Sequence, residues 1–174
     1  MTDIFHTVRV ETEQQINEVA HLAEAIWHEH FTPIIGTSQV NYMIDKFQSV
    51  PALKLQLKDG YEYYQIFDSG NFCGYCGVHP ENEKLFLSKL YIKKEFRGRH
   101  LASKAFDFLT KLCKERGLVS IWLTCNKENH GSLAVYRHLG FKTVDTQVAD
   151  IGNGYVMDDY IMEYAIPPEH KSFK

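Results

Sequence analysis

The chain has 174 residues, of which 44% are hydrophobic and 24% are charged, and its formal net charge is −3. These values are typical of one ordinary globular domain whose core needs no disulfide or metal, so we expect a single domain over residues 1–174. The weak negative charge argues against a nucleic-acid-binding face, and without an apolar run of membrane-spanning length or a signal peptide we expect a cytoplasmic protein with no membrane partner.

The first third of the chain predicts one strand and two helices. Residues Phe5–Glu11 resemble a strand, and Thr12 with Gln15 forms a capping-box signature for the helix that follows. We expect the apolar loop Phe31–Gly36 to break this helix before a second helix starts at Ser38. The apolar composition of the loop favours the rim of a substrate pocket, although core packing explains it almost as well. The residues expected at this rim are Trp27, Phe31, Pro33 and Ile34.

Strands dominate the middle of the chain. Tyr61–Phe67 and Phe72–Val78 flank the turn Asp68–Asn71, which predicts a hairpin, and Leu85–Ile92 is a largely apolar strand. Cys73 and Cys76 form a C-x-x-C pattern, but residues three apart on a strand point to opposite faces. We therefore expect buried thiols in a reducing compartment and no metal or redox site.

A basic turn follows the third of these strands. Arg97, Gly98, Arg99 and His100 lead into a helix that Gly117 ends. A helix N-terminus offers unpaired N–H groups and the positive end of its dipole. The turn therefore predicts an anion site, with phosphate as the natural ligand; solvated arginines at an ordinary strand–turn–helix junction are the alternative.

The last third predicts a strand, a short helix and two further strands. These segments are Leu118–Cys125, Asn129–Phe141, Lys142–Ala149 and Tyr155–Ile166. The whole order is βααβββαβαββ, without a linker or repeat. Three consecutive strands followed by strand–helix–strand imply a mixed sheet flanked by helices, an α/β (α+β) fold.

Two motifs in this order resemble the GNAT superfamily of acetyl-coenzyme A-dependent N-acetyltransferases, and the element order matches over nearly the whole chain. The acyl-coenzyme A signature R/Q-x-x-G-x-G/A is present as Arg97–Ala102. The resemblance implies a mixed, mostly antiparallel seven-stranded sheet with about four helices, acetyl-coenzyme A as cosubstrate and no metal. The second motif, N-x-x-A-x-x-x-Y-x-x-x-G-F, is seen at Asn129, Ser132, Tyr136, Gly140 and Phe141.

The resemblance also implies roles for individual residues. In the family the pyrophosphate binds the amides of the signature turn, and the pantetheine arm pairs with the preceding strand where two parallel strands splay apart, here Leu85–Ile92 and Leu118–Cys125. Asn129 would hydrogen-bond the cofactor, and Tyr136 would be the general acid that protonates the leaving thiolate. The residues so implied in cofactor binding are Leu90, Tyr91, Ile92, Arg97, Gly98, Arg99, His100, Leu101, Ala102, Ser103, Asn129, Ser132 and Tyr136.

Three positions depart from the family pattern. His100 replaces a glycine, which costs on the order of 1 kcal/mol if the backbone there is left-handed. Ser132 replaces an alanine, and Ser88 stands where many relatives carry a glutamate base. We expect Ser88 in the substrate site, where a serine can position a water but is no general base. The remaining candidates for the base are a water chain, Glu83, His79 and Tyr63.

The acceptor is expected between Trp27–Gly36 and roughly Val148–Asp158. Asp150, Asp158 and Asp159 either attract a cationic amine there or are solvated hairpin charges. We expect acetyl transfer to a primary amine of a small molecule, such as a polyamine, an amino acid or an aminoglycoside, and the chain loosely resembles small bacterial polyamine and diamine acetyltransferases. A protein or peptide N-terminal acetyltransferase, a non-catalytic acyl-coenzyme A-binding module and a redox or interaction protein are the alternatives. Many relatives are homodimers, so a homodimer is possible.

Overall fold

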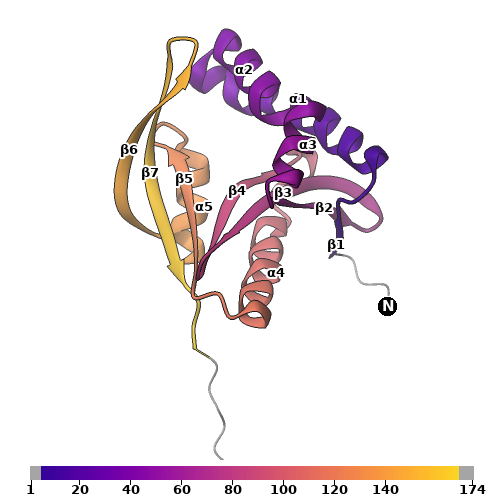
Figure 1. The fold of residues 1–174 in the computed structure, drawn as a ribbon, viewed down its shortest axis with the longest axis vertical. Coiled ribbons are helices and arrows are strands. Elements are labelled where there is room, and N and C mark those ends of the chain that lie inside the picture. Colours follow the sequence, from indigo (N-terminus) through magenta and orange to yellow (C-terminus); the bar gives the residue numbers. More distant parts are fainter. Residues whose placement is uncertain (1–4, 169–174) are drawn as a thin grey trace, which may run out of the picture.

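A seven-stranded sheet in the order β1-β2-β3-β4-β5-β7-β6 runs through the computed structural model, which describes residues 5–168 (Figure 1). All neighbouring strands are antiparallel except β4 and β5, which are parallel. The prediction of a mixed, mostly antiparallel seven-stranded sheet is therefore confirmed. The strands are β1 Phe5–Arg9, β2 Glu62–Asp68, β3 Asn71–Glu81, β4 Lys84–Ile92, β5 Ser120–Asn126, β6 Lys142–Gly152 and β7 Tyr155–Ala165.

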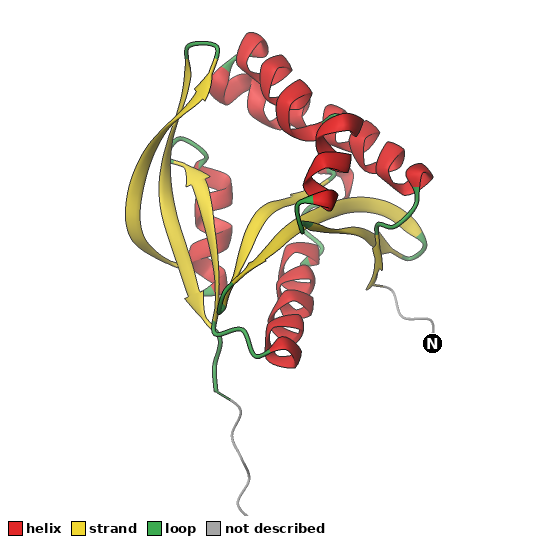
Figure 2. Cartoon of the chain, in the orientation of Figure 1, coloured by secondary structure: helices red, strands yellow, loops and turns green. Residues whose placement is uncertain are grey.

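Helices cover both faces of the sheet (Figure 2). Helices α1–α3 pack on the face that presents Tyr63 and Tyr75, whereas α4 and α5 pack on the face that presents Ile121 and Met162. Within residues 5–168 no helix is long and apolar enough to span a membrane. The helices are α1 Glu13–Ile35, α2 Thr37–Met43, the π-helix η1 Ile44–Gln48, α3 Val50–Lys58, the 3₁₀ turn η2 Lys94–Phe96, α4 Leu101–Arg116 and α5 His130–Leu139.

The predicted break of the first helix at Phe31–Gly36 is wrong. Helix α1 continues to Ile35 and contains Pro33 in its last turn. A proline there removes one backbone hydrogen bond, but the apolar side chains before it hold the helix on the sheet. The buried rings of Trp27 and Phe31 stack at a centroid distance of 4.2 Å, and both pack edge-on against Tyr91 of β4.

Helix α3 was not predicted, so the described part of the chain contains five α-helices where about four were expected. Its N-cap is Ser49, whose hydroxyl accepts a hydrogen bond from the Ala52 amide at 3.3 Å, and Pro51 stands in its first turn. Both features are helix-start signals. Just before it, Gln48 at the end of η1 is buried and accepts a hydrogen bond from Tyr75 at 2.9 Å, which fixes the π-helical turn to the sheet.

Cys73 and Cys76 are both buried free thiols on β3. The expectation that they point to opposite faces is wrong, because a β-bulge opposite Phe67 makes Cys73 an extra residue, and both cysteines pack on the α4 side. Burial raises the pKa of Cys73 to about 11 and that of Cys76 to about 12. Both therefore remain protonated, which is the unreactive form of the thiol.

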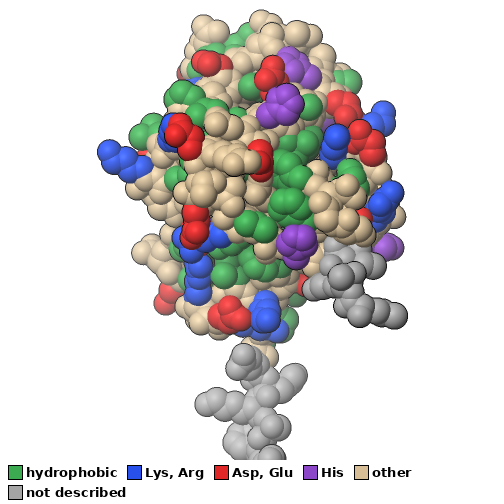
Figure 3. Space-filling view, turned by 90° about the vertical axis from the view of Figure 1, so that its right-hand side faces the viewer, with side chains coloured by type: hydrophobic (Ala, Val, Ile, Leu, Met, Phe, Trp, Pro, Cys, Tyr) green, Lys and Arg blue, Asp and Glu red, His purple; other side chains and the backbone are tan. Residues whose placement is uncertain are grey.

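Charged side chains of both signs are interspersed on the face of the molecule shown in Figure 3, where Lys and Arg lie next to Asp and Glu. This distribution agrees with the small net charge of −3. A surface of this kind lacks the single-sign field that draws a protein to a polyanion.

Candidate active site

The two parallel strands at the centre of the sheet separate from one another. Strands β4 and β5 pair only where Lys84–Phe86 meets Ser120–Trp122. At the last pair, the rings of Phe86 and Trp122 stack at a centroid distance of 4.3 Å. Beyond it, among the described residues, the edge of Leu87–Ile92 that faces β5 has no strand partner. This splay is the arrangement that the family resemblance implies, and it leaves a strand edge on which an extended ligand can pair.

A β-bulge on β4 lies at the beginning of this free edge. Leu87 pairs with Val78 and Lys89 pairs with Gly77, so Ser88 is the extra residue between them. A bulge bends its strand and increases the local twist. The bulge thus turns β4 away from β5 and brings the Ser88 side chain to the space that opens between the two strands.

The turn after β4 ends at a helix N-terminus. Gly98 has φ +81°, and His100, the N-cap of α4, is left-handed with φ +60° and ψ +24°. The His100 side chain makes no capping hydrogen bond, which leaves the first amides of α4 uncapped by it. Arg97 Nε donates to the Ile92 carbonyl at 3.0 Å, and the exposed Arg99 pairs with Asp68 at 3.4 Å. The turn therefore presents amides and two guanidinium groups together.

A cavity of about 520 Å³ lies where the two strands separate. One wall comes from α1, η1 and α3, the opposite wall comes from α5 and the β6–β7 hairpin, and its floor is formed by β4 and β5. Its lining residues include Trp27, Phe31, Phe47, Gln56, Phe86, Ser88, Lys89, Leu90, Tyr91, Cys125, Asn129, Ser132, Tyr136, Gln147, Met157 and Asp159.

The structure brings eight of the residues predicted from the sequence into this cavity and leaves the others outside its lining. Those in the lining are Trp27, Phe31, Ser88, Leu90, Tyr91, Asn129, Ser132 and Tyr136. Pro33 is exposed and Ile34 is half-buried, both towards the end of α1. The other predicted cofactor-binding residues lie at the end of β4, in the turn that follows it and at the start of α4. They are Ile92, Arg97, Gly98, Arg99, His100, Leu101, Ala102 and Ser103.

Tyr136 and Asn129 are positioned by helix α5. Asn129 caps this helix, since its Oδ1 accepts from the Ser132 amide at 3.4 Å, and it also accepts from His30 Nε2 of α1 at 3.2 Å. Burial lowers the pKa of His30, so that this contact is made by the neutral ring. The Tyr136 ring packs edge-on against Phe141. Burial raises the pKa of Tyr136 well above its ordinary value, so its hydroxyl is protonated and able to donate.

Lys89 was missed at the sequence level, although a lysine inside the apolar strand Leu85–Ile92 is itself a signal. Its side chain is buried, and Nζ donates to the Phe47 carbonyl at 2.8 Å, to Gln56 Oε1 at 2.9 Å and to the Tyr63 hydroxyl. With no carboxylate against it, burial lowers the pKa of Lys89 to about 7. Lys89 thereby ties β4 to the segment between η1 and α3 that walls the cavity.

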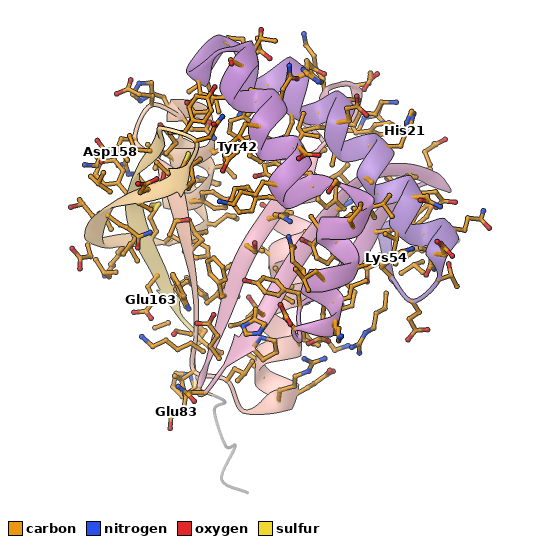
Figure 4. All side chains as sticks on the ribbon, turned by 45° about the horizontal axis from the view of Figure 1, so that its top comes forward. His21, Tyr42, Lys54, Glu83, Asp158 and Glu163 are labelled. Atoms are coloured by element: carbon orange, nitrogen blue, oxygen red, sulfur yellow. The ribbon has the colours of Figure 1, made fainter. Side chains whose placement is uncertain are left out.

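The three side chains considered as bases do not line the cavity. Glu83 is exposed in the turn between β3 and β4, at the end of the sheet far from α2 (Figure 4). His79 contacts Glu81 at 3.2 Å and the Asp59 carbonyl at 3.1 Å. Tyr63 is buried and hydrogen-bonded to Lys89.

The three hairpin aspartates differ from one another. Asp150 is exposed and accepts from the Gly152 amide at 2.8 Å, and the exposed Asp158 pairs with Lys127 at 2.8 Å (Figure 4). Asp159 is only 5% exposed and lines the cavity, so it is not a solvated hairpin charge. Burial, followed by the charge of Asp158, raises the pKa of Asp159 to about 6.

The tip of the β6–β7 hairpin lies next to α2 (Figure 1). The Tyr42 hydroxyl donates to the Ile151 carbonyl at 2.7 Å, and Tyr155 donates to Ser38 Oγ at 2.9 Å. Figure 4 shows Tyr42 on the side of its helix that faces the hairpin. These contacts join α2 to the hairpin, and both segments contribute lining residues to the cavity, Met43 and Ile151.

Comparison with known proteins agrees with this geometry. The model of the family described as Acetyltransferase (GNAT) matches residues 20–141. A Bacillus subtilis (strain 168) protein named as a ribosomal-protein-alanine N-acetyltransferase is 28% identical over 87 residues, which are 49% of this chain and 58% of that protein. The chain thus spans little more than half the length of this relative.

Solved structures share the fold over nearly the whole chain. The PaiA N-acetyltransferase of Thermoplasma acidophilum, in complex with coenzyme A, superposes with a TM-score of 0.77 at 18% identity, covering 92% of this chain and 98% of that one. The spermidine N-acetyltransferase of Vibrio cholerae, in complex with coenzyme A and spermine, gives a TM-score of 0.69 at 14% identity, covering 94% and 96%.

Proposed function

Since the chain belongs to the GNAT acetyltransferase family, we propose that it transfers the acetyl group of acetyl-coenzyme A to a primary amine of a small molecule. The observation that carries this proposal is the splay of β4 from β5, which opens into a cavity lined by Tyr136. A free strand edge, a helix N-terminus at its end and a buried proton donor together fit an extended, phosphate-bearing thioester.

The chain offers a matching group for each part of the cosubstrate. Unpaired backbone along Leu87–Ile92 fits the amides of the pantetheine arm, because an extended amide chain pairs with a strand edge. The uncapped amides of α4 and the guanidinium of Arg97 fit the pyrophosphate. The left-handed φ of His100 supports this assignment, since that conformation turns the backbone so that successive N–H groups point outwards.

Tyr136 serves as the general acid in this proposal. When the C–S bond breaks, the leaving thiolate, with a reference pKa of about 8.5, takes the proton of the Tyr136 hydroxyl. The buried and protonated state of Tyr136 supports the role. Attack also requires a free amine, and for an alkyl ammonium of pKa about 10.4 deprotonation near neutral pH costs roughly 4 kcal/mol.

The bridge between the hairpin and α2 favours a small acceptor over a folded protein. The hydrogen bonds of Tyr42 and Tyr155 join the two walls of the cavity across the acceptor side. A flexible amine fits behind such a bridge, whereas the N-terminus of a folded protein needs an open groove.

Calorimetric titration with acetyl-coenzyme A, with dephospho-coenzyme A as a control, followed by a thiol-release assay over a panel of amines, tests the proposal. We expect micromolar binding and thiol release with at least one small alkyl amine. Binding without release for any amine would favour an acyl-coenzyme A-binding module, and release with peptides alone would favour an N-terminal acetyltransferase. Absence of binding would refute the cofactor assignment.

We also propose a homodimer in the cytoplasm. The edge strand β6 supports dimer formation, because it carries exposed valines, Val144 at 57% and Val148 at 69%, next to an unpaired edge. Free, buried cysteines support a reducing compartment. Light scattering on the eluted protein measures the mass, and a monomer at micromolar concentration would contradict the dimer.

A further inference from the structure

Asp159 is a buried carboxylate that forms no salt bridge within residues 5–168. It is 5% exposed, and its Oδ1 is one of the few buried side-chain atoms among residues 5–168 without a hydrogen-bond partner. The charge of Lys127 partly offsets the effect of burial on Asp159, but the Lys127 ammonium pairs with Asp158 at 2.8 Å. Burial of an unpaired carboxylate is costly, so such groups are normally paired or hydrogen-bonded. The position therefore favours a cationic ligand.

The carboxylate lies on the acceptor side of the sheet. Successive side chains of a strand alternate between faces. On β7, Tyr160 and Met162 pack in the cluster beneath α4 and α5, whereas Met157 packs in the cluster of α1–α3. Asp159 is two residues from Met157, so its side chain lies on the same face of the sheet, and it lines the cavity. It therefore faces the wall formed by α1–α3, opposite the face that carries α4.

Tyr136 and Asp159 lie within electrostatic range of the same groups. Both raise the pKa of Tyr91 on β4, and Asp159 also raises the pKa of Cys125 on β5. Cys125 in turn raises the pKa of Tyr136. A proton donor and an unpaired carboxylate thus border one cavity from α5 and from β7.

We propose that Asp159 binds the ammonium group of a cationic alkyl amine acceptor and takes its first proton. This inference rests on the proposed acetyltransferase function and names the acceptor class and the missing base. A carboxylate in this position selects amines that are charged in solution and holds the nitrogen near the thioester before attack.

The proton inventory of the reaction balances with these two residues. Transfer of one ammonium proton to Asp159 frees the nitrogen lone pair, which forms the C–N bond to the thioester carbonyl carbon. The nitrogen loses its second proton to water, the C–S bond breaks, and the thiolate takes the proton of Tyr136. Asp159 then releases its proton to solvent and Tyr136 regains one, so one net proton is released per acetyl group.

Burial supports this assignment chemically. The pKa of Asp159 is raised from 3.8 to about 6. The group therefore remains ionised near neutral pH, as ion pairing with an ammonium requires, and it is a stronger base than an ordinary aspartate by about two pKa units. Efficient general bases have pKa values close to the working pH.

The test compares Asp159→Asn with the wild type on two acceptors, spermidine, which is cationic, and aniline, which is uncharged at neutral pH. We expect kcat/KM for spermidine to fall at least about 100-fold, the lower range for loss of a general base, and that for aniline to change less than about 3-fold. Asp145→Asn, exposed on β6 and outside the cavity lining, is the matched control and should leave both rates within about 3-fold. Calorimetry should show unchanged acetyl-coenzyme A binding in both variants.

Binding of spermidine to the protein saturated with coenzyme A gives a readout that is independent of turnover. Loss of the ion pair should weaken it at least about 10-fold in Asp159→Asn, as expected for a buried charge pair. Equal rates with spermidine in the variant and the wild type, or equal losses with both amines, would overturn the inference while leaving the acetyltransferase function intact. A wild type that transfers to other amines of the panel but neither binds nor acetylates spermidine would overturn the inference alone. A wild type that binds acetyl-coenzyme A but transfers to no amine of the panel would overturn both.

Discussion

Asparagine at position 159 should stabilise the protein at alkaline pH. The substitution keeps the size of the side chain and removes a carboxylate that is 5% exposed and has an unpartnered Oδ1. Folding transfers this group into an environment that disfavours its charged form, which is why its pKa is raised to about 6. We expect an amide to lack this penalty.

The magnitude follows from the pKa shift. A rise from 3.8 to about 6 corresponds to about 3 kcal/mol at 1.36 kcal/mol per unit. Because the folded state binds the proton more tightly than the unfolded state, stability falls as pH rises from about 4 to about 6 and stays reduced above that window. The free energy of unfolding of the variant, measured relative to the wild type, should therefore be up to about 3 kcal/mol higher at pH 8 than at pH 3.5. This corresponds to roughly 6–12 °C in Tm for a chain of this length.

Urea unfolding of the wild type, Asp159→Asn and the control Asp145→Asn at both pH values measures the effect. Asp145 is exposed and accepts a hydrogen bond from the Thr146 amide at 2.7 Å, so its amide variant should lose less than about 1 kcal/mol. A variant at 159 that is less stable at pH 8 would refute the reasoning, because it would mean that the carboxylate is well satisfied. An equal gain at both pH values would also refute it, because a charge effect must vanish where the carboxyl is protonated.

Three further substitutions and one pair of substitutions test the site. Tyr136→Phe should lower turnover about 10²-fold or more with little change in acetyl-coenzyme A affinity; unchanged turnover would reject it as the acid. Arg97→Ala should weaken acetyl-coenzyme A binding about 10-fold by calorimetry, and equal affinity would contradict the phosphate assignment. His100→Gly should change the free energy of unfolding by less than about 1 kcal/mol, because relief of the left-handed strain is offset by added freedom in the unfolded chain. In this variant, tighter acetyl-coenzyme A binding would show that the imidazole crowds the phosphates, and weaker binding would show that it donates to them. Alanine at both Cys73 and Cys76 should preserve acetyl transfer, and loss of transfer in a folded variant would revive the redox alternative.

Local patterns predicted most of the secondary structure of this chain. The capping box at Thr12 and Gln15, the glycine at 117 and the apolar strand Leu85–Ile92 each act within a few residues, and each is present in the structure. The same signals failed where distant packing outweighed them. Pro33 did not break α1, because the aromatic side chains before it are buried against β4.

The candidate site likewise has some features that depend on contiguous residues and others that depend on pairing between strands. The turn Arg97–His100 and the residues of α5 were identifiable from the sequence, because anion binding at a helix start depends on contiguous residues. The bulge at Ser88 and the splay of β4 from β5 were not identifiable from local pattern, since they depend on pairing between strands. The splay was expected only from the family resemblance.

By itself, the sequence determined the order of the seven strands, most of the helices and the turn before α4, because periodicity, capping and turn chemistry are properties of neighbouring residues. Tyr136 was singled out only through the family resemblance. Only the tertiary structure decided which charged side chains are buried. Neither Lys89 nor Asp159 was recognised as buried from the sequence, because their environments come from segments far along the chain, Phe47 and Gln56 for the lysine and Cys125 for the aspartate. Desolvation depends on what surrounds a charge in space, and a linear pattern does not contain that information.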